Sequence, residues 1–204
     1  MKIDLHVHTK ERSECAHASE DEQIQAALAA GLDAIAITDH HYFVPQARLD
    51  ELNRQYAPFR IIIGIEVTVE GEDFLVLGVR HPMLERTDWL YRDFHPWVEA
   101  RRGFMAWAHP YRYKSNLYAA LERLKPHAIE VHSPNTAPDD EGRIRELAAR
   151  LQVPLLSNSD AHTPERLGRY YNLLDYRPQD DGDLVSLLKA GRFELFADLV
   201  GARA

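Results

Sequence analysis

Cysteine and long hydrophobic runs are nearly absent from this chain. Cys15 is the one cysteine among 204 residues, which excludes an intrachain disulfide and a metal site built from several cysteines, and fits a reducing compartment. No apolar run approaches the roughly 20 residues that cross a bilayer. The start, MKIDLHVHT, places a charge and two histidines where a secretory leader has its apolar core. We therefore expect a cytoplasmic protein without a membrane contact.

Positive charge is also scarce. The chain has 24 Lys and Arg against 32 Asp and Glu, which gives a formal net charge of −8. A protein that binds a long nucleic-acid duplex through its phosphates needs a basic stripe, so the composition argues against such a partner. Small anionic substrates stay compatible with it, because divalent cations held by carboxylates would reverse the local field.

Linkers, low-complexity tracts and sequence repeats are missing as well, so we expect one domain over residues 1–204. Short apolar runs predict seven strands, at 3–7, 34–37, 61–67, 74–79, 104–108, 128–131 and 154–156. Helical patterns are found at 19–32, 46–56, 115–124, 139–151 and 183–190. The first of these helices begins with Ser19 and Glu22, which form a capping box. Strands that alternate with helices indicate an α/β fold with a parallel sheet.

Residue types that bind metals stand at the ends of the predicted strands. In chain order they are His6, His8, Asp39, His40, Glu66, His81, His109, His132, Asp160 and His162. In a (β/α) barrel the C-terminal ends of the strands meet at one mouth, so residues far apart in the sequence come together there. The expected topology therefore predicts one site built from imidazoles and carboxylates.

The segment KIDLHVHT shows this pattern most directly. The period of two along a strand places His6 and His8 on one face, where both imidazoles can reach one cation. The alternative is a partly buried histidine pair satisfied by backbone carbonyls. Asp4 shares that face and would either accept an N–H from a ligating histidine or lie at the barrel floor. In SDAH, Asp160 and His162 repeat the alternation with a harder oxygen ligand.

Glu66 follows an apolar strand, at a place where an unpaired charge would be costly to bury. A salt bridge to an arginine would satisfy its carboxylate, and so would a bridging position between two cations. At the exit of the preceding strand, His40 is the expected ligand, Asp39 would orient a neighbour or contact a metal, and His41 would belong to the loop.

Taken together, these motifs resemble the PHP domain (polymerase and histidinol phosphatase) family of metal-dependent phosphoesterases. The resemblance runs through DLHVHT, ITDH, GIE, LGVRH, AHP, IEVHS and SDAH, in the family's order and over nearly the whole chain. It implies a distorted (β/α) barrel of seven strands, similar to a TIM barrel, and a cluster of two or three divalent cations.

The resemblance also implies how the ligands are shared. His6, His8, Glu66 and Asp160 would hold the first cation, Glu66 would bridge to a second that is completed by His81 and His109, and His40 and His162 would hold a third. A residue of the loop after the first strand would complete the third position. The family often shows H-T-x-x-S-D-G there, whereas this chain reads HTKERSECAHAS. Glu14 is the first candidate and His17 the second, and Cys15 would also serve because a metal lowers the pKa of a thiol.

This mixed set of imidazoles and carboxylates suits zinc, manganese or iron. Two cations that share Glu66 would lower the pKa of a bridging water and supply hydroxide for attack at phosphorus. Asp160 or His162 would assist proton transfer to the leaving oxygen. The expected reaction is the hydrolysis of a phosphomonoester or a small phosphodiester.

Residues that would hold the phosphate are less clearly marked. Arg112 and Arg166 stand beside motifs expected at the mouth, with Lys114 and Arg169 as weaker candidates, and a solvated surface charge is the alternative for each. His132 occupies a position where the family often has asparagine, and is expected to contact substrate or support a ligand.

Two other functions fit parts of the pattern. Amidohydrolases also begin with His-x-His on the first barrel strand and hydrolyse C–N bonds, although the LGVRH and SDAH motifs favour the phosphoesterase. A non-catalytic metal-binding or regulatory domain is the other alternative, against which the intact ligand set argues. The sequence indicates neither the oligomeric state nor the particular substrate.

Overall fold

The strands of the chain form one curved sheet in a computed structural model that describes residues 1–113 and 118–198, with the backbone alone at 118–119. Nine strands lie in the order β7-β6-β5-β4-β3-β2-β1-β8-β9. They are β1 (Lys2–Val7), β2 (Ala34–Ile37), β3 (Arg60–Val69), β4 (Glu72–Leu77), β5 (Phe104–Trp107), β6 (Ala128–His132), β7 (Leu155–Ser157), β8 (Tyr170–Leu174) and β9 (Phe193–Ala197). The sheet curls into a nearly closed barrel, so the predicted α/β, TIM-like barrel class is confirmed.

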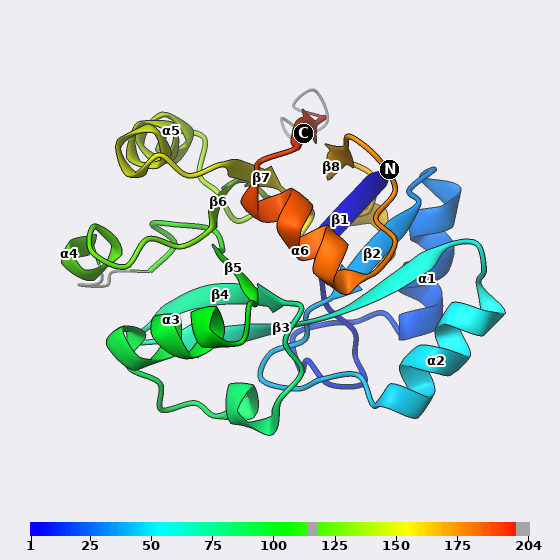
Figure 1. Ribbon diagram of the computed structural model, residues 1–204. Helices are drawn as coiled ribbons and strands as arrows, with labels where there is room; N and C mark the ends of the chain where they lie inside the picture. Colours follow the sequence, from blue (N-terminus) through cyan, green and yellow to red (C-terminus); the bar gives the residue numbers. More distant parts are fainter. Residues whose placement is uncertain (114–117, 199–204) are drawn as a thin grey trace.

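Helices surround this sheet (Figure 1). They are α1 (Glu20–Ala29), α2 (Gln46–Gln55), α3 (Tyr91–Ala100), α4 (Tyr118–Leu121), α5 (Asp140–Leu151) and α6 (Asp181–Lys189), with short 3-10 helices η1 (Pro82–Glu85) and η2 (Pro164–Arg166). The predicted capping box starts α1: Ser19 accepts the Glu22 N–H, and the Glu22 carboxylate accepts the Ser19 N–H. Part of the helix predicted at 115–124 lies outside the described residues, and α4 falls within its remainder.

All seven predicted strands form, and β8 and β9 add two that the sequence patterns did not indicate. The directions of the strands differ from the prediction of a parallel sheet. β1, β2 and β3 run parallel, as do β5, β6 and β7, but β4 runs antiparallel to both β3 and β5. The reason is a two-residue hairpin turn at Glu70 and Gly71, whose φ angles are 50° and 84°. The start of β4, rather than its end, therefore reaches the same side of the barrel as the C-terminal ends of its neighbours.

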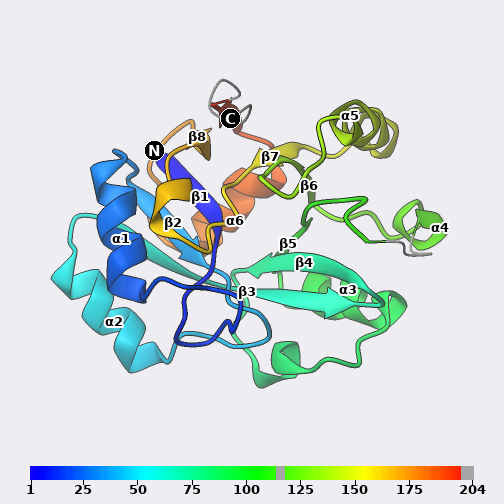
Figure 2. The same ribbon diagram turned by 180° about the vertical axis from the view of Figure 1, so that it is seen from behind.

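Helix α6 closes one end of the barrel. Its apolar residues Leu184, Val185, Leu187 and Leu188 pack with buried side chains from the barrel interior, among them Leu5. In Figure 1 this helix crosses the strands on the viewer's side, and in Figure 2 it lies behind them. The dark-blue loop that follows β1 lies on the opposite side, towards the viewer in Figure 2. The polar mouth of the barrel is thus the end that α6 leaves free.

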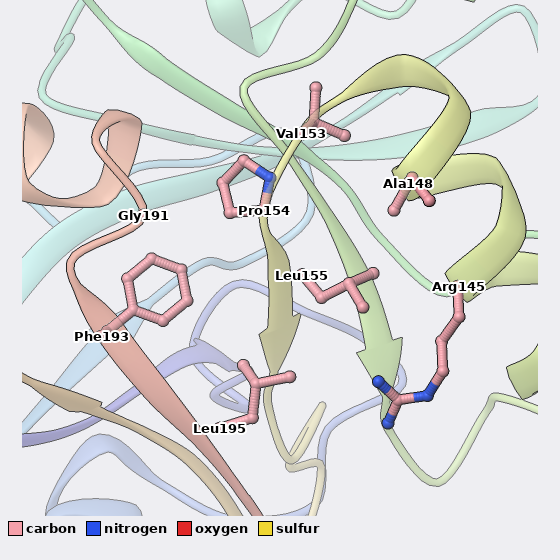
Figure 3. Close-up of a pocket in the computed structure, with 9 residues that line it drawn as sticks. Arg145, Ala148, Val153, Pro154, Leu155, Gly191, Phe193 and Leu195 are labelled. Atoms are coloured by element: carbon pink, nitrogen blue, oxygen red, sulfur yellow. The ribbon is translucent and has the colours of Figure 1, made fainter.

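The barrel has a seam between β7 and β9, the two ends of the strand order. The Ser157 hydroxyl of β7 donates to the Phe196 carbonyl of β9 at 2.6 Å, and the Ser157 N–H donates to the buried Asn172 side chain of β8 at 3.1 Å. An outer pocket of about 340 Å³ lies beside the seam, between α5 and β9 (Figure 3). Leu155 and Leu195 line it from the two strands, and Arg145 lies at its edge.

None of the helices in the described part of the chain is both long enough and apolar enough to span a membrane.

Candidate metal centre

The mouth of the barrel gathers imidazoles and carboxylates, most of them buried, from six strands or the residues just after them. These side chains are His6 and His8 (β1), His40 (after β2), Glu66 (β3), Asp73 (β4), His109 (after β5), and Asp160 and His162 (after β7). Within this set, four groups of three residues have ligand atoms that all lie within 4.8 Å of one another. Seven of the eight residues are sequence-predicted ligands, and Asp73 is the addition.

The first position lies between the two histidines of β1. Their Nε2 atoms are 3.0 Å apart, and Asp160 Oδ1 lies 3.3 Å from His6 Nε2 and 3.1 Å from His8 Nε2. Glu66 completes this arrangement at 3.4 Å from His6 Nε2 and 3.2 Å from His8 Nε2. Ligand atoms around a tetrahedral zinc lie about 3.3 Å apart, given bonds of about 2.0–2.1 Å. The four side chains are therefore spaced as one ion requires.

The second position lies on the other side of Glu66. His109 Nε2 is 3.2 Å from Glu66 Oε1 and 3.9 Å from Asp73 Oδ2. The hairpin explains the presence of Asp73, because the antiparallel β4 begins at the mouth. A signal was present in the sequence: two strand-like runs separated by Glu70 and Gly71 favour a hairpin over a parallel crossover.

The third position is bounded by His8, His40 and His162, whose ligand atoms form one of the groups within 4.8 Å. The His8 and His40 rings are stacked with centroids 4.6 Å apart, and the His8 and His162 centroids are 4.5 Å apart. Glu66 Oε2 is 3.1 Å from His40 Nδ1. Glu66 thus lies next to all three positions.

Glu130, fully buried on β6, stands behind the ligands. Its Oε1 accepts from His6 Nδ1 at 3.1 Å and from the Asn158 side-chain amide at 2.8 Å. Its Oε2 accepts from the backbone N–H of His109 at 3.0 Å. A carboxylate on Nδ1 fixes the tautomer that leaves Nε2 as the ligand atom. Glu130 is present in the sequence motif IEVHS, but no spacing rule tells a carboxylate that supports a ligand from one that binds the metal.

Ser13 and Asp39 support the other side of the centre. The Ser13 hydroxyl lies 3.2 Å from His8 Nδ1 and donates to Asp39 Oδ1 at 2.7 Å. Asp39 also accepts from the Thr9 N–H and from Arg12, so it orients the loop after β1 and is not among the residues grouped as possible ligands. Asp4 accepts the backbone N–H groups of His6 at 3.2 Å and of Ser159 at 3.1 Å.

The electrostatics favour a cation between the two histidines of β1. Burial by itself would lower the pKa of His6, but the charges of Asp160, Glu66 and Glu130 raise it well above its usual value. Burial also opposes protonation of His8, yet contacts with Asp160 and Glu66 raise its pKa to about 9. Burial would raise the pKa values of both carboxyl groups, and the nearby imidazoles lower them instead. The carboxylates therefore favour positive charge between the two histidines.

At the rim the balance differs. Burial lowers the pKa of His40 and of His162, which favours the neutral imidazole that binds metals. Burial, followed by the charge of Glu66, raises the pKa of Asp73. Burial thus sets the direction of the pKa shift at all three groups, and the charge of Glu66 acts with it on Asp73 and against it on His40.

Buried polar atoms without a hydrogen bond test whether metal ions fit here. Within the described part of the chain these include Glu66 Oε2, Asp160 Oδ1 and His109 Nδ1. A buried oxygen with no partner costs free energy that a bound cation would recover. The two carboxylate oxygens face imidazole nitrogens at 3.1–3.4 Å. The residues present therefore fit divalent cations.

Backbone strain marks the same place. His109 and Asp160 have φ angles of 28° and 44°, a region that non-glycine residues rarely adopt. Strain of this kind is found where surrounding structure holds a side chain in a functional orientation. Here it turns two candidate ligands towards Glu66 and the His6–His8 pair.

Three sequence-predicted residues are not brought to the cluster. His81 was expected at the second position, but β4 is antiparallel, so His81 follows its far end and packs against Trp97 of α3 with ring centroids 5.3 Å apart. Glu14 is exposed. His132 turns towards α5, where its Nε2 lies 3.1 Å from Arg145.

The residues expected to bind phosphate also differ in whether they reach the cluster. Arg112 reaches the cluster, with Nη1 3.8 Å from Asp160 Oδ2. Arg166 lies on η2 and makes no side-chain hydrogen bond or ion pair with the described residues. Lys114 lies outside those residues, and Arg169 is exposed.

Beside the cluster a cleft of about 290 Å³ is lined by His40, Thr68, Gly71, Asp73 and Tyr113.

Comparisons with known families agree with this geometry. Residues 4–122 match the family model of the PHP domain, and residues 138–193 match the model described as PHP-associated. No curated protein matches the chain.

Several solved structures share the fold. PsfC from Pseudomonas syringae has a TM-score of 0.77 at 19% identity, over 99% of this chain and 93% of that one. A two-domain protein from Bacteroides vulgatus, containing a predicted PHP-like metal-dependent phosphoesterase, has a TM-score of 0.73 at 18% identity. That match covers 97% of this chain and 64% of the other, so this chain spans less than two thirds of that protein. An amidohydrolase from Chromobacterium violaceum, with bound sulfate and no metal, has a TM-score of 0.63 at 18% identity over 97% and 99% of the chains.

Proposed function

Because the chain belongs to the PHP domain family, we propose that it is a metal-dependent phosphoesterase that hydrolyses a phosphomonoester or a small phosphodiester. The family and the clustered donors support a metal-dependent hydrolase, and the phosphoester as substrate is the proposal. The observation that carries the proposal is that both oxygens of the Glu66 carboxylate face imidazole nitrogens. One oxygen faces His6 and His109 at 3.4 and 3.2 Å, and the other faces His8 and His40 at 3.2 and 3.1 Å.

A carboxylate with ligand nitrogens around both oxygens is suited to bridge cations. Bound there, zinc, manganese or iron ions would lower the pKa of a water held between them and stabilise charge on the phosphoryl oxygens. His6, His8, Glu66 and Asp160 would hold one ion, and Glu66, Asp73 and His109 a second.

Arg112 would bind the phosphoryl group. Its guanidinium lies 3.8 Å from Asp160, and 36% of its side chain is exposed, so it can turn to an incoming anion. A guanidinium pairs with phosphate through charge-assisted hydrogen bonds. The rest of the substrate would lie in the cleft beside Tyr113, since His40 and Asp73 form part of that cleft as well as of the cluster.

His162 or Asp160 would deliver a proton to the leaving oxygen. His162 lies at the rim, with 22% of its side chain exposed and its Nδ1 3.4 Å from Asp160 Oδ1. Arg166 and His132 remain candidates for substrate contact beyond the cluster.

The test is hydrolysis of an aryl phosphomonoester and an aryl phosphodiester with added manganese. We expect the wild type to hydrolyse at least one ester and Glu66→Gln to lose about 100-fold or more in kcat, since loss of a mere supporting partner costs 10–100-fold. Glu122→Gln, a surface change outside the site, is the control and should match the wild type. Preference for one ester distinguishes a monoesterase from a diesterase.

Other results would contradict the proposal. Hydrolysis that is indifferent to Glu66 would exclude the shared carboxylate from catalysis. Hydrolysis of an aryl amide instead of either ester would favour the amidohydrolase alternative, to which the relative from Chromobacterium violaceum gives some weight. Cation binding without turnover of any of these substrates would favour a non-catalytic domain.

For His162→Ala, an equal rate loss with good and poor leaving groups would exclude a role of His162 in proton delivery.

A further inference from the structure

The loop between β1 and α1 is fixed tightly around Cys15. Ahead of it, the buried Ser13 donates its hydroxyl to Asp39 and accepts the His40 N–H at 3.1 Å. Behind it, the Ala16 N–H donates to the Ser13 carbonyl at 3.0 Å, and the His17 N–H donates to the His162 carbonyl at 2.9 Å. The backbone on both sides of Cys15 is thus anchored to the elements that carry the third position.

This anchoring places the Cys15 thiol at the cluster. Its Sγ lies 3.2 Å from His162 Nε2. Around a tetrahedral zinc, bonds of about 2.3 Å to sulfur and about 2.0 Å to nitrogen separate the two ligand atoms by about 3.5 Å. Cys15 and His162 therefore have nearly the spacing of two ligands to one ion. Glu14 and His17, the other candidates in this loop, are exposed like Cys15, but within the described residues neither side chain has a hydrogen bond or ion pair with the cluster.

A second observation points to a cation at the same corner. Glu66 Oε2 is buried without a hydrogen bond and lies 3.1 Å from His40 Nδ1 and 3.2 Å from His8 Nε2. The corner thus offers ligand nitrogens and an unsatisfied carboxylate oxygen next to the thiol.

We propose that Cys15 binds the third cation as a thiolate, together with His40 and His162, and that this gives the third position a different metal preference from the other two. The proposal rests on the metal centre of the proposed function. Imidazole and carboxylate ligands accept manganese, zinc or iron, whereas a thiolate selects softer ions such as zinc, iron(II) or cobalt(II) over manganese and magnesium. The sequence allowed Glu14, His17 or Cys15, and the loop geometry favours the sulfur.

Cobalt(II) is a direct probe, because a thiolate bound to cobalt gives a near-ultraviolet charge-transfer band that imidazole and carboxylate ligands do not give. Cys15 is the chain's one cysteine, so any such band comes from it. Chelator-treated protein titrated with cobalt should develop the band, and Cys15→Ser should lose both the band and one equivalent of bound cobalt. Glu14→Gln and His17→Ala should keep the band.

The outcomes separate this proposal from the proposed function. Two cobalt ions per wild-type chain without the band would overturn the role of Cys15 and leave the shared Glu66 site intact. An unchanged cobalt count in Cys15→Ser would do the same. No cobalt binding at all would overturn both. Alkylation of Cys15, followed by mass spectrometry, is a second measurement: zinc should slow it in the wild type, and equal rates with and without zinc would contradict the proposal.

Discussion

At the scale of single residues, Glu130 orients two of the candidate metal ligands, His6 and His109. It is fully buried, accepts from His6 Nδ1 on β1 and holds the backbone N–H of His109 beyond β5. Asn158 adds a third hydrogen bond at 2.8 Å and keeps the carboxylate in place. Because Glu130 acts through His6 and His109, it is a positioning residue whose removal should change metal affinity before it changes anything else.

We therefore expect Glu130→Gln to weaken metal binding by about 10–100-fold, the usual cost of losing a carboxylate behind a ligating histidine. The amide keeps the size of the side chain but removes the charge that favours the correct tautomer of His6. Metal titration with a competing chelator measures the change, and Glu122→Gln serves as the surface control. An unchanged affinity with an unchanged melting temperature would show that Glu130 is not needed to position His6.

At the scale of elements, the hairpin of β3 and β4 shapes the site. It brings Asp73 to the mouth and sends His81 away from it. Gly64 on β3 leaves room for two neighbouring side chains, since a Cβ there would lie 2.6 Å from Leu77 Cδ2 on β4 and 2.7 Å from Thr38 Cγ2. The sequence contained a turn signal in Glu70-Gly71, but strand-like runs alone do not specify direction, and the barrel prediction assumed parallel strands.

Two glycine substitutions should have opposite effects on stability. Gly64→Ala should lower the free energy of unfolding by about 1–3 kcal/mol, because the added methyl overpacks a buried contact. Gly142→Ala on α5 meets nothing within 4 Å and should raise it by up to about 1 kcal/mol through helix propensity. Denaturant unfolding of the two variants measures both. A neutral Gly64→Ala would mean that the Leu77 and Thr38 side chains can shift without cost.

At the scale of the whole molecule, the barrel fold was accessible from the sequence because short apolar runs and helical patterns alternate along it. The seven strands were located and their polar ends identified His6, His8, His40, Glu66, His109, Asp160 and His162, which the structure brings together. β8 was not indicated because a buried polar residue, Asn172, interrupts its apolar face, and neither was the edge strand β9, whose burial is only partial. Supporting roles such as those of Ser13 and Glu130 depend on which side chains meet, and spacing along one chain does not contain that information.

The geometry as a whole makes one central claim: residues from opposite ends of the chain form a shared centre for several cations around Glu66. The most direct test is elemental analysis of purified protein, with Glu66→Gln beside the wild type. The account predicts two or more zinc, manganese or iron ions per wild-type chain and a clear loss in the variant. Less than one tightly bound ion per chain, or equal metal content in the two proteins, would contradict it.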